Sequence, residues 1–121
     1  MKDAMEKMYE EAGIEYSKGL ERFMGNDALY QKFLTKFLYD ESFEEFCQGV
    51  EAGGLVMAEK AVHTLKGTAG NLSMMDLYQL ADQTVKAIRA GQKADDLRPL
   101  VKELRDAYEK VCDAIRTHNQ A

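Results

Sequence analysis

Tryptophan is absent from this 121-residue chain, proline occurs once, and cysteine occurs only twice. The near absence of proline, with charged residues recurring along most of the chain, favours a mostly helical protein over one rich in sheet. Cys47 and Cys112 lie far apart and lack the spacing of a metal-binding pair, so we expect packed, reduced thiols. One disulfide between them stays open as an alternative.

Long apolar runs are missing as well. None approaches the roughly 20 residues that cross a bilayer, and the charged N-terminus lacks the apolar region of a signal peptide. The net charge of −5 argues against unselective binding to nucleic acid or to anionic lipid. These absences predict a cytoplasmic protein with neither nucleic acid nor membrane as a partner. Nothing in the sequence calls for more than a monomer.

The chain is long enough for one hydrophobic core, and we expect a single domain over residues 1–121. Within it, residues 1–12 are predicted to form a helical extension and residues 13–118 a bundle. Apolar residues recur every three or four positions between short segments that contain Gly, Asn or Asp. The predicted helices span approximately residues 2–11, 14–23, 28–39, 42–50, 55–72, 75–90 and 97–115.

Several polar residues are predicted to begin these helices. They are Asn26 or Asp27 before the third helix, Ser42 with Glu45 as a capping box for the fourth, and Asp95 or Asp96 before the last. Pro99 falls in the first turn of the last helix, where its missing N–H costs little. The long apolar stripe of that helix is typical of a strut in an antiparallel bundle.

The predicted helix over residues 55–72 has one unusual face. When the chain advances by about 100° per residue, a stripe of small and apolar side chains falls on the side opposite His63. The stripe consists of Ala58, Ala61, Leu65, Thr68, Ala69 and Leu72. Such a stripe suits close packing in a core, so we expect His63 to face solvent.

The neighbours of His63 on that face are a cation and two glycines. Lys66, Gly67, Gly70 and Asn71 follow it at i+3, i+4, i+7 and i+8. Each glycine inside a helix costs about 1 kcal/mol relative to alanine, so we interpret both as space for a macromolecule to approach. A cation one turn away stabilises a negative group on the imidazole. The pattern predicts a histidine that is transiently anionic and is visited by a partner.

The segment AVHTLKGTAGNL over residues 61–72 closely resembles the signature of histidine-containing phosphotransfer (HPt) domains. In that family, His-x-Leu-Lys-Gly is followed by small residues and an aliphatic position. The similarity extends over most of residues 13–115. It implies an all-α fold, an antiparallel four-helix bundle with additional short N-terminal helices.

The resemblance also implies a function in phosphorelay signal transduction. His63 is then the phospho-accepting nucleophile, which takes a phosphoryl group from, and returns it to, an aspartate of response-regulator receiver domains. Lys66 and Gly67 are expected at the partner-facing site, with Gly70, Glu59 and Asn71 as further binding residues. A hybrid histidine kinase is a further expected partner. No intrinsic cofactor is expected, Mg²⁺ is expected on the receiver, and the chain has no nucleotide-binding motif of a kinase.

Two positions depart from the family pattern. Ser73 stands where glycine often follows the aliphatic position, which bears on how the His-bearing helix ends. Val85 stands near the position where many members place Gln or Glu close to the phosphohistidine, and valine cannot make that hydrogen bond. Two alternatives therefore stay open: a non-catalytic module that docks receivers, and the phospho-accepting domain of a larger histidine kinase. Met1 and the finished last helix favour a stand-alone protein.

Other patterns around the site are weaker. Residues 67–70 match the GxxG loop of RNA-binding KH domains, but the chain is acidic and has no strand pattern. Glu59 and His63 are four residues apart, as metal ligands on a helix can be, yet no second His-bearing helix completes a set, so we expect no metal site.

Two further expectations concern residues outside the motif. His118 follows the last apolar position and is predicted to be solvated. The methionines are interpreted mainly as core filler. Met57, Met74 and Met75 are candidates for a docking patch beside His63.

Overall fold

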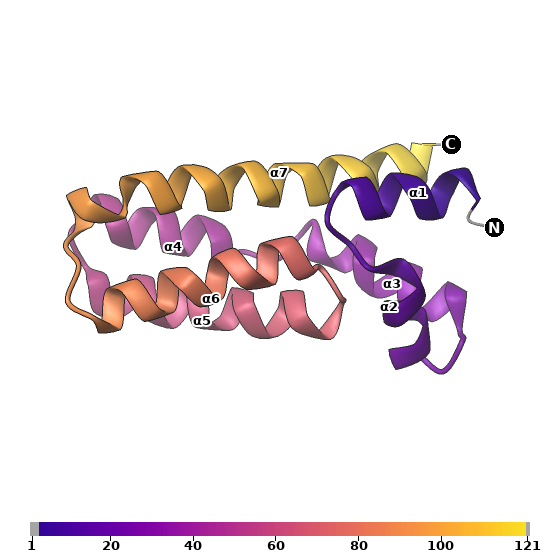
Figure 1. The fold of residues 1–121 in the computed structure, drawn as a ribbon, viewed down its shortest axis with the longest axis horizontal. Coiled ribbons are helices and arrows are strands. Elements are labelled where there is room, and N and C mark those ends of the chain that lie inside the picture. Colours follow the sequence, from indigo (N-terminus) through magenta and orange to yellow (C-terminus); the bar gives the residue numbers. More distant parts are fainter. Residues whose placement is uncertain (1–2, 121) are drawn as a thin grey trace.

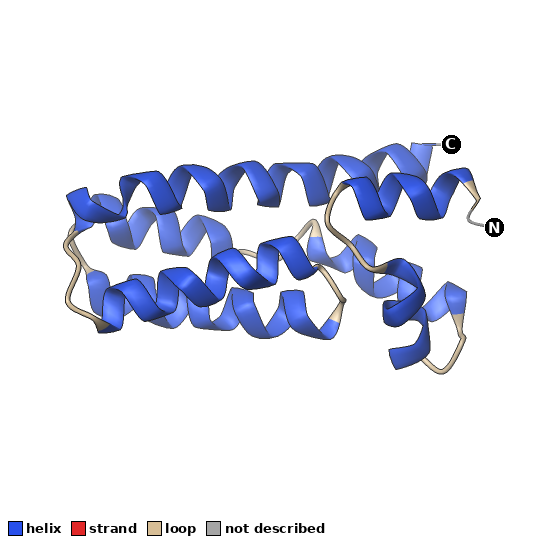
Figure 2. Ribbon diagram, viewed as in Figure 1, coloured by secondary structure: helices blue, strands red, loops and turns tan. Residues whose placement is uncertain are grey.

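The computed structural model describes residues 3–120, and most of them lie in helices (Figures 1 and 2). The helices are α1 (Ala4–Glu11), α2 (Tyr16–Arg22), α3 (Asp27–Phe37), α4 (Ser42–Glu51), α5 (Leu55–Asn71), α6 (Met75–Arg89), the short 3-10 helix η1 (Ala94–Leu97) and α7 (Arg98–Gln120). Over residues 3–120 there is no strand, only one isolated bridge between Ile14 and Met74. The predicted all-α class is confirmed. Within this part of the chain, no helix is both long and apolar enough to span a membrane.

Helices α4, α5, α6 and α7 run alternately in opposite directions, which confirms the predicted antiparallel four-helix bundle (Figure 1). Helix α7 is the longest and lies along the others as a strut, as its apolar periodicity predicts. Its Tyr108 ring stacks on Phe43 of α4 with the ring centroids 4.4 Å apart. The largest fully buried side chains of the bundle helices are Phe46, Leu65, Leu77, Leu104 and Ile115.

Helix α1 lies beside the C-terminal half of α7 (Figure 1). Tyr9 of α1 is fully buried, and its ring centroid lies 5.7 Å from that of His118. His118 is therefore half-buried, and the prediction that it is solvated is wrong. The reason is tertiary, because Tyr9 of α1 packs against the His118 ring.

Helices α2 and α3 form a hairpin at the same end of the bundle, against the C-terminal end of α5 (Figure 1). The buried Tyr30 hydroxyl of α3 donates a hydrogen bond of 2.7 Å to the Leu72 carbonyl. Its ring passes directly over Gly19 of α2, where any Cβ would overlap the hydroxyl. Burial raises the pKa of Tyr30, so its hydroxyl stays a donor throughout the neutral range. This hydrogen bond joins the hairpin to the end of the His-bearing helix.

Ser73 ends α5 in the left-handed backbone conformation, with φ of +59°. The N–H of Met74 donates to the Ala69 carbonyl at 2.9 Å, which closes the helix end in the way that glycine usually does. The Ser73 carbonyl accepts a hydrogen bond of 2.9 Å from the N–H of Glu15. Serine at position 73 therefore still adopts the left-handed conformation that glycine would adopt there. Its carbonyl joins the end of α5 to Glu15, just before α2.

The predicted helix starts are right in one case and wrong in two. Asn26 caps α3 by accepting a backbone hydrogen bond of 3.0 Å. The capping box at Ser42 is wrong: Asp40 accepts from the backbone N–H of Ser42 at 2.9 Å, because a carboxylate two residues earlier reaches the helix start first. Neither Asp95 nor Asp96 caps α7, because both belong to η1, which precedes it.

Candidate functional site

Helix α5 buries the predicted stripe and leaves His63 exposed, as its spacing predicts. Two residues differ from the prediction. Val62 is also fully buried, because the packed face of α5 is wider than the predicted stripe. Thr68 is only half-buried, because it borders a surface pocket beside the α3 side chains Phe33 and Phe37.

His63 lies in an open pocket of about 410 Å³. Its lining residues come from α2, α5 and α6: Arg22, His63, Lys66, Gly67, Gly70, Asn71, Met75 and Tyr78. The fold therefore brings four of the predicted binding residues together with His63. Arg22 and Tyr78 were missed, since the sequence offers no sign that either lies near position 63.

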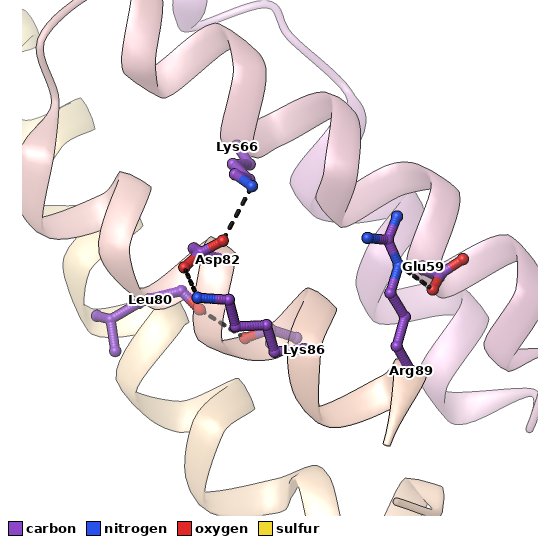
Figure 3. Close-up of polar contacts among 7 residues, drawn as sticks. Glu59, Lys66, Leu80, Asp82, Lys86 and Arg89 are labelled. Atoms are coloured by element: carbon purple, nitrogen blue, oxygen red, sulfur yellow. Dashed lines mark hydrogen bonds and ion pairs between the residues drawn. The ribbon is translucent and has the colours of Figure 1, made fainter. Parts of the chain in front are cut away.

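Glu59 is the predicted binding residue that does not reach this pocket. Its carboxylate accepts a hydrogen bond of 3.0 Å from Nε of Arg89, which joins α5 to α6 one turn before His63 (Figure 3). The structure adds an interhelical ion pair to Glu59, and its role in partner binding stays a prediction. Within residues 3–120, no group of three or more His, Cys, Asp or Glu side chains is arranged to hold a metal ion.

The two glycines of the motif have different surroundings. A Cβ at Gly67 would meet nothing within 4 Å, so the helix backbone there is open to a partner. A Cβ at Gly70 would lie 3.1 Å from the ring of Tyr78. Gly70 therefore makes room for a side chain of α6 and also lines the His63 pocket. Clearance for a partner stays a prediction for both glycines, and the open space at Gly67 supports it there.

Lys66 is not a free cation. Its Nζ lies 2.9 Å from the carboxylate of Asp82 on α6, and the second oxygen of that carboxylate lies 2.9 Å from Nζ of Lys86 (Figure 3). The ammonium also sits over the Tyr78 ring, 5.8 Å from its centroid. Asp82 was missed because it is far from Lys66 in sequence. Its only local sign is the i,i+4 spacing to Lys86.

The rotation of α6 about its own axis also decides where the Val85 side chain lies. Its side chain is 1% exposed and belongs to the core, so it does not face the His63 surface. The expectation that position 85 lies close to the histidine is therefore wrong for this chain. The side of α6 that faces the exposed part of α5 carries Tyr78 and Asp82 instead.

The three candidate docking methionines have different environments. Met75 lines the His63 pocket, Met57 is 50% exposed at the start of α5, and Met74 is fully buried. Both cysteines are free and packed, Cys112 more deeply than Cys47.

Lys66 and then Lys86 hold the pKa of Asp82 below its usual value. A carboxyl with a lowered pKa in the folded state contributes stability above its unfolded pKa, about 3.9, and loses it as the pH falls through the folded value. We expect Asp82→Asn to lower the urea midpoint at pH 7, and the wild-type and variant midpoints to converge below about pH 4. Urea titrations from pH 3 to 7 measure this, with the exposed Asp106→Asn as control. A difference that stays constant with pH would contradict the role of Asp82.

Comparison with known protein families gives one match. The model of the Hpt domain matches residues 38–114, well over half of the chain, which include α4, α5 and α6 with most of α7. No curated protein and no solved structure gives a significant match. The match begins after α3, so the helices that carry Arg22 and Tyr30 lie outside it. Hpt domains are histidine phosphotransfer modules of two-component phosphorelays. The match and the four-helix bundle together establish that this chain belongs to the Hpt domain family.

Proposed function

We propose that His63 receives a phosphoryl group from the phosphorylated aspartate of a receiver domain and returns it to another. One observation carries this proposal: the exposed His63 ring lies beside the open backbone of Gly67, within the segment that matches the family. A receiver must bring its aspartyl phosphate into line with a ring nitrogen, and a bulky side chain at position 67 would obstruct that approach.

The transfer exchanges one bond to phosphorus for another. The lone pair of a neutral ring nitrogen forms the N–P bond as the O–P bond to the aspartate breaks, and the electron pair of that bond leaves on the aspartate carboxylate. The other ring nitrogen then releases its proton to solvent. The reverse sequence phosphorylates the next receiver. The transition state is loose and highly charged, and Mg²⁺ held by the receiver would stabilise the phosphoryl oxygens.

Lys66 supplies a positive charge from this chain, and its ion pair with Asp82 restrains where that charge lies. Asp82 holds its ammonium beside the pocket that His63 occupies, so the phosphoryl group and Asp82 compete for the same cation. The ion pair thus holds Lys66 in position before a phosphoryl group arrives, while the Asp82 carboxylate partly offsets its charge. We place this reaction in the cytoplasm and in a monomer, with a hybrid histidine kinase as one source of phosphorylated receiver.

The proposal is tested by mixing the protein with a panel of Mg²⁺-loaded, phosphorylated receiver domains and following acid-labile label. We expect label on the wild type, none on His63→Gln, and full label on His118→Gln, since His118 lies against Tyr9 of α1 and does not line the His63 pocket. Label on His63→Gln, or no label on the folded wild type across the panel, would overturn the proposal.

A non-catalytic docking module is the second candidate. It is favoured by the ion pair of Lys66 with Asp82, because that carboxylate partly offsets the charge of the cation one turn from His63. Under this candidate, a receiver binds the wild type and His63→Gln equally tightly and no label moves. Binding isotherms measured beside the label assay separate the two functions.

A further inference from the structure

We propose that Arg22 completes a phosphoryl-binding site around His63, and so adds a cation from outside the segment that matches the family. This inference rests on the proposed function of His63. Arg22 is the last residue of α2, and its side chain lines the same 410 Å³ pocket as His63 and Gly67. The site is thus assembled from α2, α5 and α6 together.

The charges around the pocket favour an anion. None of the lining residues is an Asp or a Glu, whereas Arg22 and Lys66 are both cations. Lys66 is already paired with Asp82, and Lys86 lies on the other side of that carboxylate with 74% of its side chain exposed. Arg22 is exposed and has no ion pair within residues 3–120. Of the two lining cations, Arg22 is therefore the one whose charge is not already offset by a carboxylate.

The chemistry of the guanidinium fits the expected ligand. Its planar set of N–H donors matches two oxygens of a phosphoryl group at once, whereas an ammonium acts as a point charge. Asn71 lines the same pocket and offers an amide donor. Tyr78 of α6 closes one side, so the groups that face a phosphoryl group on His63 are Arg22, Lys66, Asn71 and Tyr78, with Asp82 behind Lys66.

The fold holds Arg22 in place through contacts beside it. Phe23, the next residue, packs against the buried Tyr30 ring with centroids 5.1 Å apart. Tyr30 in turn is hydrogen-bonded to the carbonyl of Leu72 at the end of α5. The N–H of Glu15, just before α2, donates to the carbonyl of Ser73. Both ends of α2 are therefore fastened to the end of the helix that carries His63.

The pKa of a phosphoryl group on His63 would show directly whether the Arg22 cation lies beside it. A nearby cation favours the dianionic form of the group and so lowers the pKa of its second ionisation. Removing a cation at a few Å in a mostly aqueous setting is expected to raise that pKa by about half a pH unit, a roughly threefold change in the protonation equilibrium. A residue that only supports the fold would leave this pKa unchanged.

The test uses the whole protein phosphorylated with phosphoramidate, a small donor that needs no receiver, and follows the phosphohistidine by ³¹P NMR between pH 5 and 9. We expect a raised phosphoryl pKa in Arg22→Gln and values close to wild type in Arg22→Lys. Lys18→Gln is the matched control, because Lys18 lies on the same helix with its side chain 70% exposed and does not line the pocket.

Each outcome decides one point. Equal phosphoryl pKa values in Arg22→Gln and Lys18→Gln would overturn the role of Arg22 and leave the proposed function intact. A phosphoryl pKa in Arg22→Lys as high as in Arg22→Gln would also overturn it, since a cation at position 22 would then have no effect. If His63 takes up no phosphoryl group in any folded variant, from phosphoramidate or from receivers, the proposed function itself fails and this inference with it.

Discussion

Replacing Gly67 with leucine is expected to slow phosphoryl transfer from a receiver by about a hundredfold, while the protein stays folded. The expectation follows from the open backbone at this position, where an added Cβ meets nothing within 4 Å. A leucine side chain one turn from His63 would stand in the path of the receiver and displace its aspartate. A displacement of about 1 Å in the reacting geometry can cost on the order of a hundredfold in rate.

Two measurements separate this effect from damage to the histidine itself. Uptake of label from phosphoramidate should change little, because a small donor reaches the ring without docking on the helix. Transfer from a phosphorylated receiver should fall in steps from glycine to alanine to leucine. Equal losses with both donors would show that position 67 acts on His63 directly, and an unchanged rate with the receiver would show that the receiver approaches from elsewhere.

Replacing Gly19 with alanine is expected to destabilise the protein by about 2 kcal/mol. A Cβ at this position would overlap the Tyr30 hydroxyl. That ring cannot move aside easily, because it is fully buried and its hydroxyl is bonded to the Leu72 carbonyl. Overpacking costs about 1–3 kcal/mol and the strained hydrogen bond about 1 kcal/mol, against which alanine gains about 1 kcal/mol of helix propensity.

Gly67→Ala is the matched control, because it makes the same substitution in the middle of a helix with open space around it. We expect it to raise the free energy of unfolding by about 0.5–1 kcal/mol. Urea unfolding of both variants measures the difference, and Tyr30→Phe with Gly19→Ala should recover part of the loss by removing the hydroxyl. If Gly19→Ala is as stable as Gly67→Ala, α2 does not pack on α3 as the structure shows.

Features that repeat within one helix were predictable from sequence. The spacing of apolar residues on α5 placed His63 on the exposed side, and the same periodicity on α7 predicted the long strut. Asn26 was recognisable as a cap, because the capping hydrogen bond reaches only to the N–H of Leu29, three residues later. The HPt-like motif likewise lies within a single helix, and the family match bears out the resemblance.

Features that join different helices were not predictable in this way. Lys66 was expected to offset the charge of a phosphoryl group, and its ion pair was not foreseen: the rotation of α6 about its own axis presents Asp82 to it and turns Val85 into the core. Gly70 was expected to clear a surface, but the same rotation places Tyr78 against it. His118 was expected in solvent, but Tyr9 of α1 packs against it.

The sequence by itself determined which residue is the candidate nucleophile and on which side of its helix it lies. The reason is that side-chain direction in a helix follows from a fixed rotation per residue, which needs no knowledge of the other helices. Only the tertiary structure decided which charges surround His63: Asp82 beside Lys66, and Arg22 across the pocket. Those neighbours depend on how α2 and α6 are rotated and packed, and that is set by the shape of the whole core rather than by any local pattern.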